Sequence, residues 1–218
     1  MSGHLEFRDF LTFEELLREP LLAKSLVRAY QTTFGQSEVW AESYSDAEVW
    51  QKLKEQLAGH AALRVCVDAD GAVVAFFWAQ LCTAEGILRS IATIKYSESL
   101  VTPALRATLQ QALGTREVIY VHDFGILREY RGRIWLTHLI GPALWEIAAR
   151  TGNGRVLFWT VSRTQVEAFA RRARFDEVLV SNGMHFHLGE FVVARPCDGI
   201  NLPWRRPLSA GPAHVQAR

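Results

Sequence analysis

The stretch from Phe124 to Leu144 constrains the fold more than any other part of the sequence. An apolar strand pattern ends near Leu127, a short basic turn follows, and a long helix pattern begins after Arg133. The first N–H groups of a helix lack partners within the helix and carry partial positive charge, so they attract phosphate. Arg131 and Arg133 flank Gly132, where a ligand can approach the backbone closely. The pattern predicts either an anion-binding turn or an ordinary strand-to-helix connection with two solvated arginines.

The rest of the sequence predicts strands and helices on both sides of this stretch. Strands are expected at Leu5–Phe10, Ala62–Asp68, Ala72–Leu81, Glu117–Leu127, Arg155–Val161, Phe175–Val180 and Met184–Ala194. Helices are expected at Thr12–Phe34 with an interruption at Pro20, from a capping box at Ser45 and Glu48 to about Ala58, at Pro103–Leu113, from Arg133 to about Thr151, and at Thr164–Arg174. The remainder of Cys82–Gly114 is expected to be an irregular insertion. Pro142 should bend its helix because it removes a hydrogen bond to the carbonyl of His138.

Composition and charge exclude several classes of function. The 218 residues are 49% hydrophobic with a net charge of +1 and no basic stripe, so no nucleic-acid partner is expected. No apolar run reaches the length of a membrane span and the N-terminus lacks a signal-peptide core, so no membrane partner is expected. Cys66, Cys82 and Cys197 are odd in number and widely spaced, which fits neither a disulfide framework nor a zinc site. We therefore expect a cytoplasmic protein without a metal.

In its order of elements the chain resembles the N-acetyltransferase superfamily related to the general-control acetyltransferases, called GNAT, over about residues 5–194. The segment Glu129–Arg133 looks like the family's phosphate turn, and the helix ending at Phe169–Phe175 is similar to a family helix that closes with a Tyr and then a Gly-Phe pair. The resemblance implies an α+β fold, with a mixed central sheet of about seven strands flanked by helices. It implies one domain, residues 1–195, followed by a flexible tail, residues 196–218.

The same resemblance implies a coenzyme A thioester as acyl donor or substrate. In the family, backbone amides after the arginine hold the pyrophosphate and the edge of the central strand holds the pantetheine arm. The cofactor-binding residues that follow are Phe124, Ile126, Arg131, Gly132, Arg133, Ile134, Trp135 and Leu136.

Several positions depart from the family's pattern. Ile134 and Leu136 stand at two positions of the turn where the family has small residues. Arg163 stands where the family commonly has an asparagine, and Arg174 where it has a glycine. Ala170 replaces the tyrosine that in the family often protonates the departing thiolate. The backbone contacts to pyrophosphate survive such changes because any residue supplies an N–H group. The loss of the tyrosine bears on the chemistry of acetyl transfer instead.

Four residues are candidates for catalysis. His122 lies on the predicted central strand and is either a base that titrates near neutral pH or a partly buried core histidine, whereas Asp123 on the opposite face should form a cap or an ion pair. Thr160 ends the next strand, where a hydroxyl could polarise a thioester carbonyl or simply favour the strand. His185 and His187 are two residues apart on a predicted strand, so both project from the same face. They could face a pocket as a polar pair or be exposed to solvent. They could also be two ligands of a metal ion, although the sequence spacing indicates no third ligand.

Three functions remain open. The first is an acyl-CoA-dependent acyltransferase acting on a small-molecule amine or an acyl carrier protein, with His122 as base. The second is a decarboxylase of malonyl-type thioesters, like a GNAT-like branch in polyketide loading modules, which would use Thr160 with His185 or His187. The third is a non-catalytic module that binds acyl-CoA.

Overall fold

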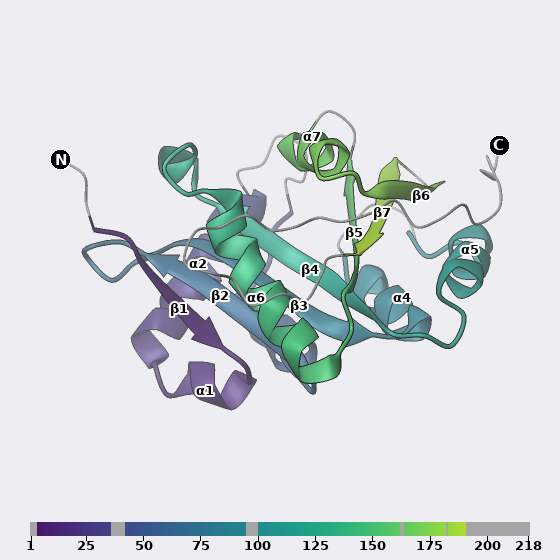
Figure 1. Ribbon diagram of the computed structural model, residues 1–218. Helices are drawn as coiled ribbons and strands as arrows, with labels where there is room; N and C mark the ends of the chain where they lie inside the picture. The colour runs from purple at the N-terminus through teal and green to yellow at the C-terminus, as the bar shows by residue number, and fades with distance from the viewer. Residues whose placement is uncertain (1–3, 36–41, 95–99, 162–163, 182, 191–218) are drawn as a thin grey trace. The chain divides into compact units, whose positions relative to one another are not determined.

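The central sheet is mixed and contains seven strands in the order β1-β2-β3-β4-β5-β7-β6 (Figure 1). The computed structural model describes residues 4–35, 42–94, 100–161, 164–181 and 183–190. The strands are β1 (Glu6–Phe10), β2 (Ala61–Val67), β3 (Val73–Cys82), β4 (Val118–Ile126), β5 (Arg155–Val161), β6 (Asp176–Ser181) and β7 (Met184–Glu190). The pairs β1–β2, β2–β3, β5–β7 and β6–β7 are antiparallel, and β4–β5 is parallel. The predicted α+β fold is confirmed, while the expected boundary at residue 196 lies outside the described residues.

The helices follow the sequence prediction except in the segment after β3. They are α1 (Phe13–Leu17), α2 (Pro20–Gly35), α3 (Asp46–Gln56), α4 (Ala84–Ala92), α5 (Pro103–Leu113), α6 (Leu136–Thr151) and α7 (Gln165–Arg172). The capping box of Ser45 and Glu48 forms as predicted. None of the helices in the described segments is long and apolar enough to cross a membrane.

Helix α4 corrects the prediction of an otherwise irregular insertion. The Thr83 side chain caps it by accepting a hydrogen bond from the Gly86 N–H group. Ile87, Leu88 and Ile91 then fall on one buried face at helical spacing. The prediction was wrong because Gly86 weakens the helix signal in the first turn of a short segment.

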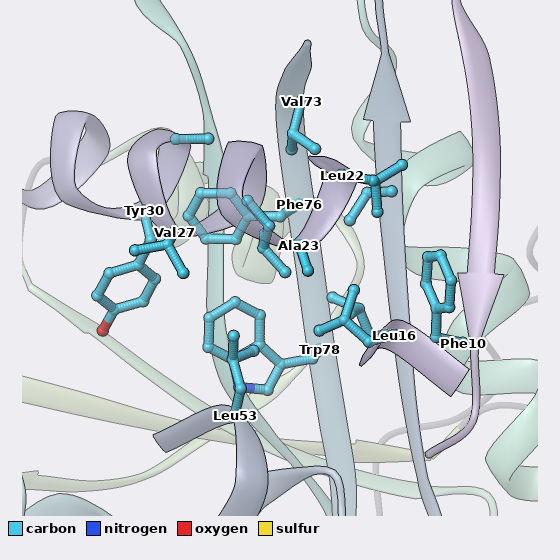
Figure 2. Close-up of a cluster of buried hydrophobic side chains, with 14 of the residues drawn as sticks. Phe10, Leu16, Leu22, Ala23, Val27, Tyr30, Leu53, Val73, Phe76 and Trp78 are labelled. Carbon is cyan, nitrogen blue, oxygen red and sulfur yellow. The ribbon is translucent and has the colours of Figure 1, made fainter. Parts of the chain in front are cut away.

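The described residues form two compact units that interleave along the chain, and the first comprises the chain up to Gln80 together with His122–Thr151. Its core packs side chains of β1–β3 against α1, α2 and α3 (Figure 2). Tyr30 of α2 is central to this core, because its ring stacks on Trp78 at 5.6 Å and lies 5.7 Å from Phe76. The aromatic contacts bury the middle of α2 against β3.

Among the described residues, the second unit comprises Leu81–Val121 and the segment from Gly152 to Glu190. One face of its strands packs on α4 and α5 through alternate residues of β7, namely Met184, Phe186 and Leu188. The other face carries Phe158 of β5, whose ring contacts Phe175 at 5.0 Å in an edge-on geometry. Because side chains alternate along a strand, His185 and His187 of β7 project from this second face.

Helix α6 runs through Pro142 without interruption and lies across β2 (Figure 1). Proline has no N–H group, so the carbonyl of His138 lacks its usual donor within the helix. Arg64 of β2 replaces that donor, because its Nε atom lies 2.9 Å from the His138 oxygen. A side chain from the sheet thus supplies the hydrogen bond that the helix sequence removes.

The end of α7 contains an arginine in a conformation that favours glycine. Arg174 has a φ of 58°, in the left-handed region, and it follows the C-cap residue Ala173. The Phe175 N–H group donates to the Ala170 carbonyl at 3.0 Å, which closes the helix end. The backbone therefore takes up the left-handed turn although the residue there is not glycine.

A double-mutant cycle at Arg64 and Pro142 can measure how much the hydrogen bond to the His138 carbonyl stabilises the protein. Arg64→Met should lower the free energy of unfolding by about 1–3 kcal/mol because it leaves this carbonyl unpaired. In a Pro142→Ala background the new N–H group can donate to it, so the same substitution should cost less. Contacts of Arg64 with other residues are lost in both backgrounds and cancel. Equal costs in urea denaturation of the two backgrounds would contradict this role.

Replacing Arg174 with glycine should stabilise the protein by roughly 1 kcal/mol, because a side chain is disfavoured at this φ. The matched control is Arg172→Gly, which lies in the last helical turn of α7 and should destabilise by about 1 kcal/mol. Thermal and urea denaturation measure both variants. A loss of stability in Arg174→Gly would show that its side chain contributes more than its backbone conformation costs.

Candidate functional site

The turn that the sequence predicts as a possible anion-binding site lies directly after β4. Leu127 donates its N–H group to the Val74 carbonyl at 2.9 Å, which fixes the end of β4 on β3. A 3-10 turn, η1 (Arg128–Tyr130), follows. Gly132 then has a φ of 82°, so the turn uses the left-handed conformation that glycine allows. Helix α6 begins at Leu136, as the strand–turn–helix pattern predicts.

The backbone of this turn presents open donors. Among the described residues, the N–H groups of residues 134–137 have no hydrogen-bond acceptor, whereas those of His138 and Leu139 both donate to the Trp135 carbonyl. Four consecutive N–H groups without acceptors at a helix start carry partial positive charge. This backbone is suited to binding a phosphate group.

The side chains of the turn divide into exposed and buried sets. Arg131, Arg133 and Trp135 are exposed, and the Arg131 Nε atom donates to the Ile126 carbonyl at 3.3 Å. Ile134 is buried and Leu136 is partly buried. The bulky residue at the first small position of the family pattern therefore points into the protein interior and leaves the outer surface of the turn clear.

Phe124 and Ile126 lie on β4 just before the turn and are both partly buried. Gly125 between them faces the core, where an added Cβ atom would lie 2.6 Å from the Phe76 ring. Strand alternation therefore directs Phe124 and Ile126 to the opposite face.

His122 is a partly buried residue of β4 with a hydrogen-bonding partner. Its Nε2 atom lies 3.2 Å from the Gln80 Oε1 atom. Part of its surface is exposed, yet the surrounding protein still desolvates the ring. This burial, with a smaller contribution from the Lys52 charge, lowers the pKa of His122 to about 3. The ring is neutral at pH 7 and is a much weaker base than an ordinary histidine.

A buried charged cluster lies beside His122. The Lys52 Nζ atom of α3 donates to the Tyr30 hydroxyl at 2.9 Å and lies 3.5 Å from the Asp123 Oδ2 atom. The Tyr30 hydroxyl also lies 3.5 Å from this carboxylate oxygen. The ion pair expected for Asp123 is therefore present.

Burial dominates the electrostatics of this cluster. It raises the pKa of Asp123, although the Lys52 charge and the hydrogen bonds from Lys52 and Tyr30 partly oppose the rise. The Asp123 side chain keeps 15% of its surface exposed, whereas Lys52 keeps 9%. A partly exposed carboxylate with a raised pKa is a candidate proton acceptor.

Lys52 and Tyr30 are not among the site residues predicted from the sequence. A signal was available in α3, because Lys52 falls three residues after the buried Val49 and next to the buried Leu53. A lysine on an apolar helix face requires a partner inside the protein.

In the second unit, Thr160 is a residue of β5 whose side chain contacts the start of α7. It is 4% exposed, and its Oγ1 atom lies 2.7 Å from that of Thr164. Thr164 is the N-cap of α7, where its hydroxyl accepts from the Glu167 N–H group at 3.1 Å. The Thr160 hydroxyl therefore has a structural role in the helix cap.

The two histidines of β7 have different surroundings. His185 is the strand partner of Thr160, and its Nδ1 atom lies 2.7 Å from the Glu177 carboxylate. His187 is 3% exposed and its ring stacks on Phe158 at 5.3 Å. Neither of its nitrogens has a hydrogen-bond partner among the described residues, and burial lowers its pKa. His187 is thus a neutral buried ring, not the solvent-exposed side chain considered above.

The remaining predictions concern metal ligands, the cysteines and the positions that depart from the family's pattern. Within the described ranges, no group of three or more His, Cys, Asp or Glu side chains is placed to hold a metal ion. Cys66 and Cys82 are buried and form no disulfide bond within the described residues, and Cys197 lies outside them. Ala170, at the tyrosine position, is fully buried. Arg163, at the asparagine position, lies outside the described residues.

Comparison with known proteins identifies the fold. Neither protein-family models nor curated proteins match the sequence. FeeM, an N-acyl amino acid synthase from uncultured soil microbes, is 10% identical with a TM-score of 0.59 over 87% of this chain and 92% of FeeM. The PaiA N-acetyltransferase from Thermoplasma acidophilum, solved with coenzyme A, is 10% identical with a TM-score of 0.54 over 86% of this chain and 99% of PaiA.

A third similar structure carries the family name. A protein assigned to the GNAT acetyltransferases, from Desulfovibrio desulfuricans, is 12% identical with a TM-score of 0.51 over 88% of this chain and all of that protein. At these identities the likeness establishes the fold. The chain has the GNAT fold, as its sequence predicts.

The pKa of His122 can be tested through stability. Folding favours its neutral form, so this stabilisation is complete above the ordinary pKa of about 6.5 and is lost as the pH falls towards 3. His122→Gln should remove the effect while its amide can still donate to Gln80. Between pH 6.5 and 4, urea denaturation should show the variant gaining on the order of 2–4 kcal/mol relative to wild type. A difference independent of pH would contradict a buried neutral ring.

Proposed function

We propose that the protein is an acyl-CoA-dependent acyltransferase that transfers an acyl group from coenzyme A to an amine. The observation that carries this proposal is the turn after β4, where the open N–H groups of residues 134–137 lie beside the exposed Arg131 and Arg133. In a GNAT fold these groups fit the pyrophosphate of coenzyme A. Residues 131–136 would hold it, and the pantetheine arm would run along the backbone edge of β4 beside Phe124 and Ile126, an edge that borders both faces of the strand.

Asp123 is better suited than His122 to accept a proton from the amine. Burial weakens the histidine as a base, whereas it raises the pKa of the carboxyl group. In the proposed reaction the amine nitrogen bonds to the thioester carbonyl carbon as the carbon–sulfur bond breaks. Asp123 takes the amine proton, and the thiolate takes a proton from water. Lys52 and Tyr30 would hold the carboxylate in place.

The choice of an amine as acceptor rests on two proteins of the same fold. FeeM is an N-acyl amino acid synthase, and the Thermoplasma protein is an N-acetyltransferase. Both names specify an acyl group on nitrogen. A partly exposed carboxylate such as Asp123 also attracts an ammonium group and can then take up its proton.

Decarboxylation of a malonyl-type thioester has less support from the geometry. It would need Thr160 to polarise the carbonyl, but the Thr160 hydroxyl is hydrogen-bonded to Thr164, the N-cap residue of α7. Its proton donor would be His185 or His187, and burial favours the neutral form of His187. Acyl transfer would instead use Asp123, which keeps 15% of its side-chain surface exposed although Lys52 and Tyr30 hold it.

Asp123→Asn should lower kcat for acyl transfer by about 10²- to 10⁴-fold, because the amide cannot accept the proton. The affinity for coenzyme A, measured by calorimetry, should stay unchanged. His122→Gln is the matched control on the same strand and should retain kcat within a few-fold. In wild type, kcat/KM should fall as the pH drops below the raised pKa of Asp123, and this limb should vanish in Asp123→Asn.

Other outcomes select other functions. The reverse ranking of the two variants would identify His122 as the base. Carbon dioxide released from a malonyl thioester would identify the decarboxylase, and coenzyme A binding without turnover of any thioester would identify a binding module. Thermal denaturation of each variant separates loss of catalysis from loss of folding.

A further inference from the structure

The turn between β2 and β3 is closed by one carboxylate. Asp68 follows β2, and its Oδ1 atom accepts hydrogen bonds from the Asp70 and Ala72 N–H groups, each at 3.0 Å. The Asp68 backbone also pairs with Gly71 and Ala72. One oxygen of the carboxylate is therefore fully used within the hairpin, while Oδ2 faces away from these donors.

The second oxygen of Asp68 binds the turn after β4. The Tyr130 hydroxyl donates to Oδ2 at 2.8 Å, across 62 residues of sequence. Burial alone would raise the pKa of Asp68, but the Tyr130 hydroxyl and the hairpin N–H groups outweigh it and lower that pKa. The acceptor is therefore an ionised carboxylate at neutral pH, and hydrogen bonds to ionised groups are the stronger kind.

Tyr130 in turn contacts the residues that face a ligand. Its carbonyl accepts from the Arg133 N–H group at 3.0 Å, and the Arg133 guanidinium lies 5.0 Å from the centre of its ring. Arg131, Gly132 and Arg133 are themselves exposed. The position of this exposed segment therefore depends on Tyr130 rather than on its own burial.

We infer that Asp68 and Tyr130 form a brace that positions Arg133 and the open N–H groups for the phosphates of the acyl donor. The inference rests on the proposed function and adds two positioning residues, one of them in a hairpin remote in sequence. A turn held in place before binding loses less conformational entropy when the phosphates arrive. The brace acts on the phosphates alone, so it should not affect a donor that lacks them.

Tyr130→Phe tests the brace because it keeps the ring beneath Arg133 and removes only the hydroxyl. We expect the Kd for coenzyme A, measured by calorimetry, and the KM for acyl-CoA to rise roughly 5- to 30-fold. At saturating acyl-CoA, kcat should be unchanged. With acyl-pantetheine, which has no phosphate, kcat/KM should match wild type. A general loss of structure would lower activity with both donors and would overturn the inference.

Substitutions at Asp68 provide a graded comparison. Asp68→Asn keeps an oxygen for the hairpin N–H groups and an amide that can donate to the Tyr130 oxygen, so its Kd should lie between wild type and Tyr130→Phe. Asp68→Ala should weaken coenzyme A binding at least as much as Tyr130→Phe. Equal coenzyme A affinity in wild type and Tyr130→Phe overturns the brace and leaves the proposed function standing. Wild-type protein without affinity for coenzyme A overturns both.

Discussion

The hydrogen bond from Arg64 to the His138 carbonyl joins the first turn of α6 to the middle of β2. Pro142 leaves this partly buried carbonyl without a helical donor, and a carbonyl shielded from water without a partner is costly. Arg64 lies in the middle of β2, so the bond holds the first turns of α6 on the sheet. Arg150 donates to the Ala61 carbonyl and holds the other end of the helix. The start of α6, with its open N–H groups, is therefore tied to the strand that leads to Asp68.

Burial has opposite effects on two adjacent residues of β4. It disfavours the charged form of either group, so the pKa of His122 falls while that of Asp123 rises. Lys52 contributes to both positions, because its charge attracts the carboxylate and repels a protonated imidazole. The Lys52 charge lowers the pKa of both groups, so burial, and not the lysine, makes Asp123 the stronger base of the two. The charge pattern of β4 alone does not reveal this.

The sequence predicts the parts of the structure that local patterns determine. The capping box at Ser45 and the strand–turn–helix around Gly132 follow from neighbouring residues, and both form as expected. Helix α4 was missed because Gly86 weakens a short pattern that tertiary packing nevertheless stabilises.

The contacts of the candidate site could not be derived in the same way. Lys52 and Asp123 are 71 residues apart, and Asp68 and Tyr130 are 62 apart, so only the folded chain brings them together. The predicted roles of Phe124, Ile126 and residues 131–136 in binding coenzyme A remain predictions.

The double role of Asp68 limits what the β2–β3 hairpin can tolerate. An exposed hairpin tip with a glycine is ordinarily a good place to insert a peptide tag or to accept a longer loop. Here one carboxylate joins the Asp70 and Ala72 N–H groups to the Tyr130 hydroxyl. Extra residues between positions 68 and 72 would rotate that carboxylate away from the tyrosine. Surface exposure at this tip is therefore a poor guide to where the chain can be lengthened.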